Sequence, residues 1–150
     1  MKLGAISILF GTESGNAELV ADDIAGTFND AGVKAEVVAM EDVDVADLSE
    51  TETIAVITST YGEGELPAMA APFQQALLDA RPDLSALRFA AFGLGDSTYE
   101  TYNNAIGVLV KDLTALGARQ IGETGRHDAV SGEPFTDIAV AWARNIVAEL

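Results

Sequence analysis

The sequence predicts a three-layer α/β sandwich, in which a parallel β-sheet lies between two layers of helices. Three observations predict it. The chain has 150 residues with 49% hydrophobic content, which suits one compact domain, residues 1–150, with a substantial core. Segments with strand-like and helix-like spacing of apolar residues alternate along it. No repeat or low-complexity tract interrupts the alternation, which is typical of βαβ units with right-handed crossovers.

The first βαβ unit is clearly patterned. Leu3–Phe10 is an apolar and β-branched run of strand length. Ala17–Ala31 repeats apolar residues every three or four positions, which predicts a helix, and Gly32 is a typical residue just past a helix end. Val33–Met40 predicts the second strand. Strand, helix and strand therefore follow one another in the order that a parallel sheet requires.

The later elements continue this alternation. Two of their strands, the third and the fourth, are short and mainly apolar runs, as expected for a sheet buried on both faces. Trp142 lies on the last predicted helix, where we expect it to pack in the core or on the helix face, and His127 is expected in a surface loop. The predicted elements are strands at Ile54–Ser59, Phe89–Leu94 and, short, Gln120–Glu123, and helices at Ala68–Ala80, at Tyr102–Leu116 with Gly117 as cap, and at Pro134–Leu150.

Composition excludes several function classes. Eight basic residues against 24 acidic ones give a net charge of -16, which repels nucleic acid and anionic membrane surfaces. The absence of cysteine excludes disulfides, thiolate nucleophiles and cysteine-ligated metals, so any redox chemistry must come from a bound cofactor. No apolar run approaches the roughly 18–20 residues that span a bilayer, and the amino terminus lacks a secretion signal. We therefore expect a soluble cytoplasmic protein.

The acidic residues are unevenly distributed. Between Lys34 and Arg81 there is no lysine or arginine. This stretch is either a solubilising surface or a docking face for a cationic partner. Its acidic residues are Glu36, Glu41, Asp42, Asp44, Asp47, Glu50, Glu52, Glu63, Glu65 and Asp79.

The segment FGTESGNAE, residues 10–18, joins the first strand to the first helix. It has neither the lysine and spacing of a Walker loop nor the glycine spacing of a dinucleotide-binding loop, which disfavours ATP and NAD. A hydroxyl-rich turn into a helix amino terminus can bind a phosphate monoester through free backbone N–H groups and short polar side chains. The alternative is that Ser14 or Asn16 merely caps the helix.

Two further loops follow the third and fourth strands, where ligands bind in such sheets. STYGEGELP, residues 59–67, places Tyr61 before two glycines that allow close backbone approach to a ligand. GLGDSTYETYN, residues 93–103, offers Tyr99 among further glycines. Either tyrosine alone could be a packed or surface residue, but together they could sandwich a planar ring beside the phosphate turn.

The three motifs FGTESGNAE, STYGEGELP and FGLGDSTYETYNN occur in the order and spacing of the short-chain flavodoxins. The chain resembles this family over essentially its whole length, in particular the MioC and YqcA type and the FMN domains of diflavin reductases such as cytochrome reductase and the sulfite reductase flavoprotein. The resemblance implies a flavodoxin-like fold with a five-stranded sheet of order 2-1-3-4-5, a noncovalent FMN, and single-electron transfer through the flavin semiquinone.

Position by position, the resemblance implies which residues bind the flavin. Tyr99 would stack on the ring, and the peptide of Gly62 would hydrogen-bond to flavin N5. Thr124–Asp128 departs from the acidic, glycine-rich turn that diflavin domains carry at this place. The candidate residues are Thr12, Glu13, Ser14, Gly15, Asn16 and Ala17 around the phosphate, Thr60, Tyr61, Gly62 and Gly64 on one ring face, Leu94, Gly95, Asp96, Tyr99 and Asn103 on the other, and Asp128.

The resemblance also implies a monomeric electron carrier rather than an enzyme, with no catalytic or metal-ligating residue. Its partners would be basic redox proteins, namely an NADPH-dependent flavodoxin reductase and an electron acceptor, which dock on the acidic face. The alternative is an FMN-dependent NAD(P)H-quinone reductase of the same fold, which would need a substrate pocket over the ring.

Overall fold

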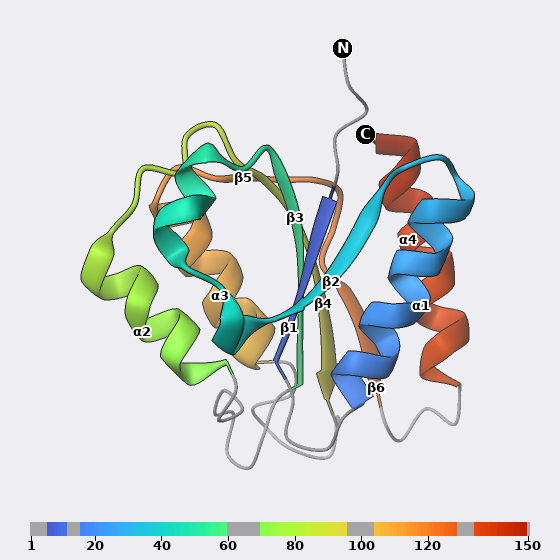
Figure 1. Ribbon diagram of the computed structural model, residues 1–150. Helices are drawn as coiled ribbons and strands as arrows, with labels where there is room; N and C mark the ends of the chain where they lie inside the picture. The colour runs from blue at the N-terminus through green and yellow to red at the C-terminus, as the bar shows by residue number, and fades with distance from the viewer. Residues whose placement is uncertain (1–5, 12–15, 60–69, 96–103, 129–133, 150) are drawn as a thin grey trace.

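The computed structural model describes residues 6–11, 16–59, 70–95, 104–128 and 134–149. Strands and helices alternate along the chain, as the sequence predicts (Figure 1). The strands are β1 (Ile6–Gly11), β2 (Ala35–Ala39), β3 (Thr53–Ser59), β4 (Arg88–Gly95), β5 (Arg119–Gln120) and β6 (Gly125–Asp128). The helices are α1 (Asn16–Asp30), α2 (Ala71–Ala80), α3 (Asn104–Ala115) and α4 (Phe135–Glu149), with the 3₁₀ helices η1 (Met40–Asp42) and η2 (Val45–Glu50).

The sheet has the order β2-β1-β3-β4-β5, and β6 also pairs with β4. All these pairs are parallel. The predicted fold class and strand order are therefore confirmed. Because β2 and β3 pair with opposite sides of β1, the chain direction across the sheet reverses there, which defines the topological switch point.

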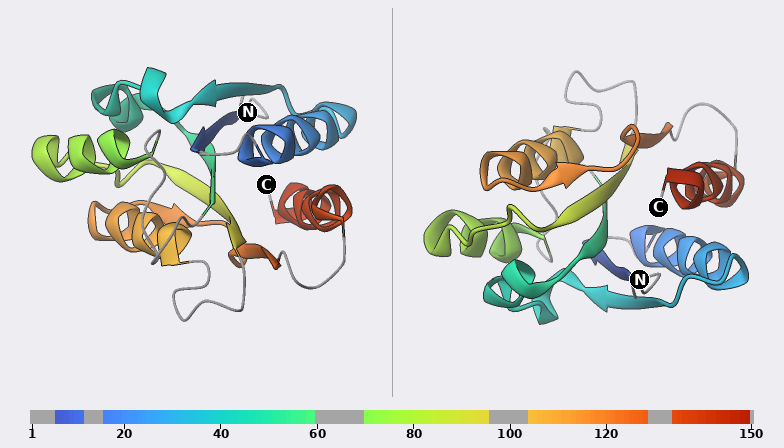
Figure 2. Two further views of the ribbon diagram at one scale, coloured as in Figure 1. Left: turned by 90° about the horizontal axis from the view of Figure 1, so that it is seen from below. Right: turned by 90° about the horizontal axis from the view of Figure 1, so that it is seen from above.

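Two hydrophobic layers fill the space between the sheet and its helices. Helices α1 and α4 cover one face, and α2 and α3 cover the other (Figure 2). Alternate residues of β1 serve the two layers: Ile8 and Phe10 pack under α1 and α4, whereas Leu9 packs under α2 and α3. Burial on both faces explains why the central strands read as continuous apolar runs.

The predicted helices and the first four strands are confirmed, with shifts at their ends. Parts of the predicted first strand, second and third helices, and carboxyl terminus lie outside the described residues. The second strand ends at Ala39 rather than Met40. Met40 instead begins η1, where its carbonyl accepts from the Val43 N–H and its side chain is buried. Neither 3₁₀ helix was predicted from the sequence.

The predicted fifth strand, Gln120–Glu123, is wrong in its bounds. Strand β5 begins at Arg119, one residue before the predicted start, and pairs with β4. The chain then turns away from β4 at Gly122, where φ is 64°. It pairs with β4 again as β6. Residues 121–124 separate the two strands, so no long insertion divides them. The sequence Gly-Arg-His-Asp has no apolar residue and therefore no apolar strand pattern. Its place in the sheet comes from backbone pairing with β4.

His127 is likewise not a surface loop residue. It lies on β6 beside Leu94 of β4, and only 8% of its surface is exposed. Trp142 fulfils its predicted packing role. Its ring meets Phe92 edge to face at a centroid distance of 5.3 Å, and its Nε1–H donates to the Glu123 carbonyl oxygen over 3.1 Å.

Candidate functional site

The parallel strands β1, β2, β3, β4 and β6 all end at one edge of the sheet, which lies toward the bottom of Figure 1. The register places Gly11 beside Thr58, Leu94 beside Ser59, and Asp128 beside the last residue of β4. The sequence therefore brings the anchors of all three predicted ligand loops, and the end of β6, to adjacent positions. We call this region the loop edge.

Helix α1 begins at the loop edge. Its first residue, Asn16, follows β1 after residues 12–15, so its free N–H groups and the positive end of its dipole lie at the end of β1. Ala17, in the first turn, is fully buried against the core, which fixes where the helix starts. Such a helix start is suited to a phosphate group.

Gly11 explains how the described anchors of two of the loops are held at a fixed separation. A Cβ atom at this residue would lie 2.6 Å from the Cβ of Ala70 and 3.0 Å from the Met40 sulfur. Gly11 directly precedes residues 12–15, and Ala70 directly follows residues 60–69. The last residue of β1 thus packs on the segment that enters α2, and this contact sets the separation of the two loop anchors.

Gly11→Ala is therefore expected to lower the free energy of unfolding by about 1–3 kcal/mol, the usual cost of overpacking a core. It should also weaken cofactor binding, because both loop anchors must move apart. Urea unfolding of the apoprotein and a fluorescence titration with FMN measure the two effects. The double variant Gly11→Ala/Ala70→Gly removes the opposing methyl group and should recover much of both losses; no recovery would contradict the steric explanation.

The structure places five of the predicted site residues at the loop edge. Asn16 and Ala17 lie in the first turn of α1, Leu94 and Gly95 end β4, and Asp128 ends β6. The remaining ones lie outside the described residues: Thr12, Glu13, Ser14, Gly15, Thr60, Tyr61, Gly62, Gly64, Asp96, Tyr99 and Asn103.

Two residues at the loop edge, Ala70 and Thr58, were not predicted from the sequence, and Gly11 was predicted only as a member of the first loop motif, without a role of its own. Thr58 is 1% exposed and lies near the carboxyl end of β3, next to the predicted ring-binding loop. A polar residue near the end of an apolar strand was the signal that could have found it. The contact between Gly11 and Ala70 left no such signal, because it joins residues far apart in the chain.

The described residues fit a flavin mononucleotide. The start of α1, just after β1, offers backbone N–H donors to a phosphate. The ends of β3 and β4 lie next to the end of β1, on the side away from β2. The last residues of β1, β3 and β4 are small, namely Gly11, Ser59 and Gly95, so the backbone itself can approach a planar ring. Phosphate and ring would thus lie at neighbouring strand ends.

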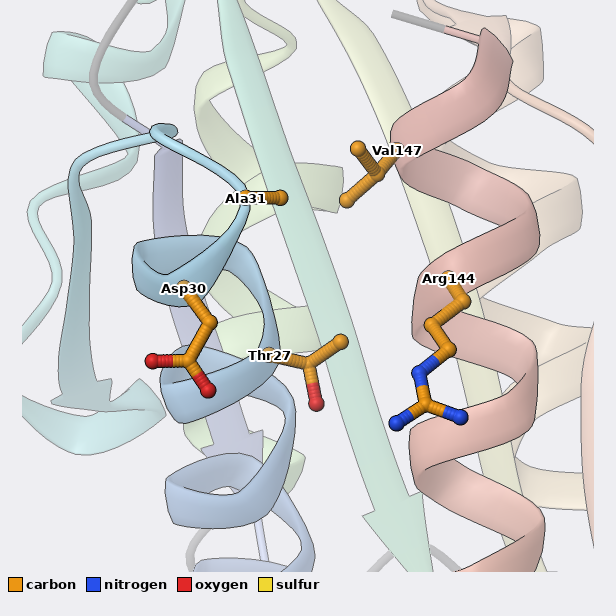
Figure 3. Close-up of a pocket in the computed structure, with 5 residues that line it drawn as sticks. All are labelled: Thr27, Asp30, Ala31, Arg144 and Val147. Carbon is orange, nitrogen blue, oxygen red and sulfur yellow. The ribbon is translucent and has the colours of Figure 1, made fainter.

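A surface hollow of about 250 Å³ lies elsewhere, between the carboxyl-terminal parts of α1 and α4. In Figure 3 the side chain of Arg144 extends from α4 toward Thr27 of α1. Asp30 also lines the hollow. The carboxyl end of α1 lies at the opposite end of the sheet from the loop edge. This hollow is therefore separate from the predicted site.

Neither a metal centre nor a membrane span is found in the part of the chain that the structure describes. Its residues form no group of three or more histidine, cysteine or acidic side chains that could hold a metal ion. Within the same ranges, no helix combines the length and apolar character needed to cross a membrane.

Comparisons with known proteins agree with this geometry. The sequence profile described as flavodoxin matches residues 8–142. Protein MioC of Escherichia coli O157:H7 is 36% identical over 137 residues, which cover 91% of this chain and 92% of MioC. The inducible nitric oxide synthase of Mus musculus is 34% identical over 91% of this chain but only 12% of its own. The solved structure of a point mutant of flavodoxin from Pseudomonas aeruginosa superimposes with a TM-score of 0.88 at 30% identity, covering 97% of this chain and 98% of that one.

Proposed function

The chain belongs to the flavodoxin family, and from this we propose that it carries single electrons on a noncovalently bound FMN between a reductase and an acceptor. The observation that carries the proposal is the family match across residues 8–142, in a fold whose strand ends meet at the loop edge. Bound FMN supplies the group that accepts and releases electrons. The residues of the chain bind it, orient it and set the charge around it.

We propose the flavin site in detail from the sequence motifs. Thr12, Ser14 and the N–H groups at the start of α1 hold the phosphate. Tyr99 stacks on the ring, and the peptide of Gly62 hydrogen-bonds to N5. The described anchors support this arrangement, because the loops that carry these residues all leave or enter the loop edge.

We also propose that the protein turns over no substrate of its own and works as a monomer in the cytoplasm. Its partners are then proteins with a basic surface, including an NADPH-dependent reductase. The net charge of -16 supports this, because it attracts cationic proteins and opposes self-association.

Anaerobic reductive titration of the yellow holoprotein tests the function. Addition of dithionite in half-equivalents is expected to build up a stable one-electron-reduced form, visible as long-wavelength absorbance, before full bleaching. A direct two-electron bleach, together with oxidation of NAD(P)H by a quinone in the presence of the purified protein alone, would replace the carrier with the quinone reductase.

We expect the carboxylates of the ring-binding loops to lower the reduction potential at which the flavin takes up its second electron. Changing Glu63, Glu65, Asp96 and Glu100 to their amides is expected to raise the potential of the second one-electron couple, because less negative charge then opposes the doubly reduced, anionic flavin. The expected rise is on the order of tens of millivolts. Spectroelectrochemistry measures it.

A matched control neutralises four exposed carboxylates on α1 and α4, the helices that cover one face of the sheet. If this control raised the potential as much as the loop variants, net charge rather than local charge would be responsible. An unchanged or lower potential in the loop variants would contradict the prediction outright. The control residues are Asp22, Asp30, Asp137 and Glu149.

A further inference from the structure

A groove on the α2 and α3 side of the sheet is lined by none of the residues proposed to bind the flavin. Its floor is formed by two neighbouring pairs of strand residues, Leu9 with Val38 and Ser7 with Ile54. Its wall is formed by η1, η2 and the residues between and just after them. Its volume of about 170 Å³ is below the roughly 300–1,000 Å³ of small-molecule sites, and suits a single side chain. We call it the β1–β2 groove.

The lining of the groove is apolar below and acidic above. Leu9 and Ile54 are buried in the floor, whereas Asp42, Asp44 and Asp47 are exposed along the wall. Among the described residues none of these three carboxylates has an ion-pair partner. The negative charge at the rim is therefore unneutralised by the part of the chain that the structure describes.

Ser7 adds a polar group inside the groove. It interrupts an otherwise apolar strand, is half-buried, and faces the same side of the sheet as Leu9. Within the described ranges its hydroxyl has no hydrogen-bond partner. A half-buried hydroxyl without a partner can accept a hydrogen bond from a cationic group that enters the groove.

These features fit a long aliphatic side chain that ends in a positive charge. The stem would cover the apolar floor, and the ammonium group would reach the carboxylates and the Ser7 hydroxyl. A second copy of this chain does not suit the groove, because both copies carry a net charge of -16. We propose that the β1–β2 groove receives a lysine side chain of a basic partner protein, an inference that rests on the proposed electron-carrier function.

The groove lies beside the loop edge, so a lysine bound in it can orient the partner protein. Asp42 follows the carboxyl end of β2 at the loop edge, whereas η2, with Asp44 as its cap, leads back toward the start of β3. A partner lysine held there occupies the flank of the sheet and leaves the loop edge free for electron transfer. The groove thus orients the partner beside the flavin site without covering it.

Tetralysine is a suitable probe for this groove. Titrated into the ¹⁵N-labelled holoprotein, it is expected to cause saturable amide shifts confined to the groove, including Val38, Val43 and Thr51. Asp44→Asn/Asp47→Asn should weaken its binding about tenfold. Asp44 accepts from the Ala46 N–H over 3.0 Å, and the amide oxygen introduced by Asp44→Asn can accept the same bond, so η2 should keep its cap.

A charge-matched control and a second groove variant complete the test. Asp22→Asn/Asp30→Asn removes the same charge from α1 and should leave groove binding within about twofold. Ser7→Ala changes no charge and should weaken binding about fivefold, the usual effect of one lost hydrogen bond. Equal weakening by both Asp-to-Asn pairs, shifts spread over the whole acidic surface, or tighter binding of spermine or Mg²⁺ than of tetralysine would overturn the proposal.

The titration requires no electron transfer, so its failure would leave the electron-carrier function standing. Conversely, a two-electron bleach in the reductive titration would remove the carrier function without altering a positive binding result. The two proposals can therefore fail separately.

Discussion

Gly125→Val is expected to lower the free energy of unfolding by at least about 3 kcal/mol, the upper end of the usual overpacking cost. A Cβ atom at Gly125 would lie 2.5 Å from Cδ2 of Phe92 and 2.5 Å from Cδ1 of Trp142. The rings of Phe92 and Trp142 pack against each other, so neither can move aside without displacing the other. Valine would therefore push β6 away from β4 or α4 away from the sheet. Urea unfolding of the apoprotein, followed by circular dichroism, measures the loss.

The control for this prediction is Gly26→Ala on α1. Apart from the backbone of α1 itself, no atom lies within 4 Å of a Cβ placed there, so this change should stabilise the protein by about 0.5–1 kcal/mol through helix propensity. Gly125→Val/Trp142→Leu should cost less than the sum of its single changes, because the smaller side chain makes room. Strict additivity of the two changes would contradict the steric mechanism.

Thr12→Ala/Ser14→Ala is expected to raise the dissociation constant of FMN by about 10²–10⁴-fold. Each lost hydrogen bond to a charged phosphate costs about 1.5–3 kcal/mol, and every 1.4 kcal/mol is a factor of ten. Quenching of FMN fluorescence by the apoprotein measures the affinity. The effect should depend on the phosphate, since both side chains are proposed to contact only that part of the cofactor.

Riboflavin, which lacks the phosphate, provides the matched ligand control. Its affinity should be nearly equal in the parent protein and in the double variant. Thr114→Ala, an exposed change on α3, should affect neither ligand. If the variant instead lost thermal stability while the ratio of FMN to riboflavin affinity stayed constant, the loop would only cap α1. This experiment therefore decides between the two interpretations that the sequence leaves open.

Sequence patterns predicted the large elements well for a simple physical reason. The helices α1 and α4 carry apolar residues at helical spacing, and the central strands are buried on both faces. In both cases the signal comes from side chains within the segment itself. The predicted flavin loops also rest on a local signal, from their glycine, hydroxyl and aromatic residues, and their role stays a prediction.

The misassigned segments are those held by distant parts of the chain. β6 has no apolar pattern of its own, and it is a strand because β4 offers it backbone partners and because Gly125 leaves room for Trp142. His127 is buried for the same reason. The helices η1 and η2 contain several acidic residues, yet Met40, Val45 and Leu48 hold them against the core.

The sequence by itself thus determined the alternation of strands and helices, the family and the loops proposed to bind FMN, because each is encoded by residues adjacent in the chain. Only the tertiary structure decided the division of the fifth strand, the contact of Gly11 with Ala70 and the groove beneath η1 and η2. These three features arise where segments distant in sequence meet, and their geometry depends on backbone pairing and close packing rather than on any local pattern.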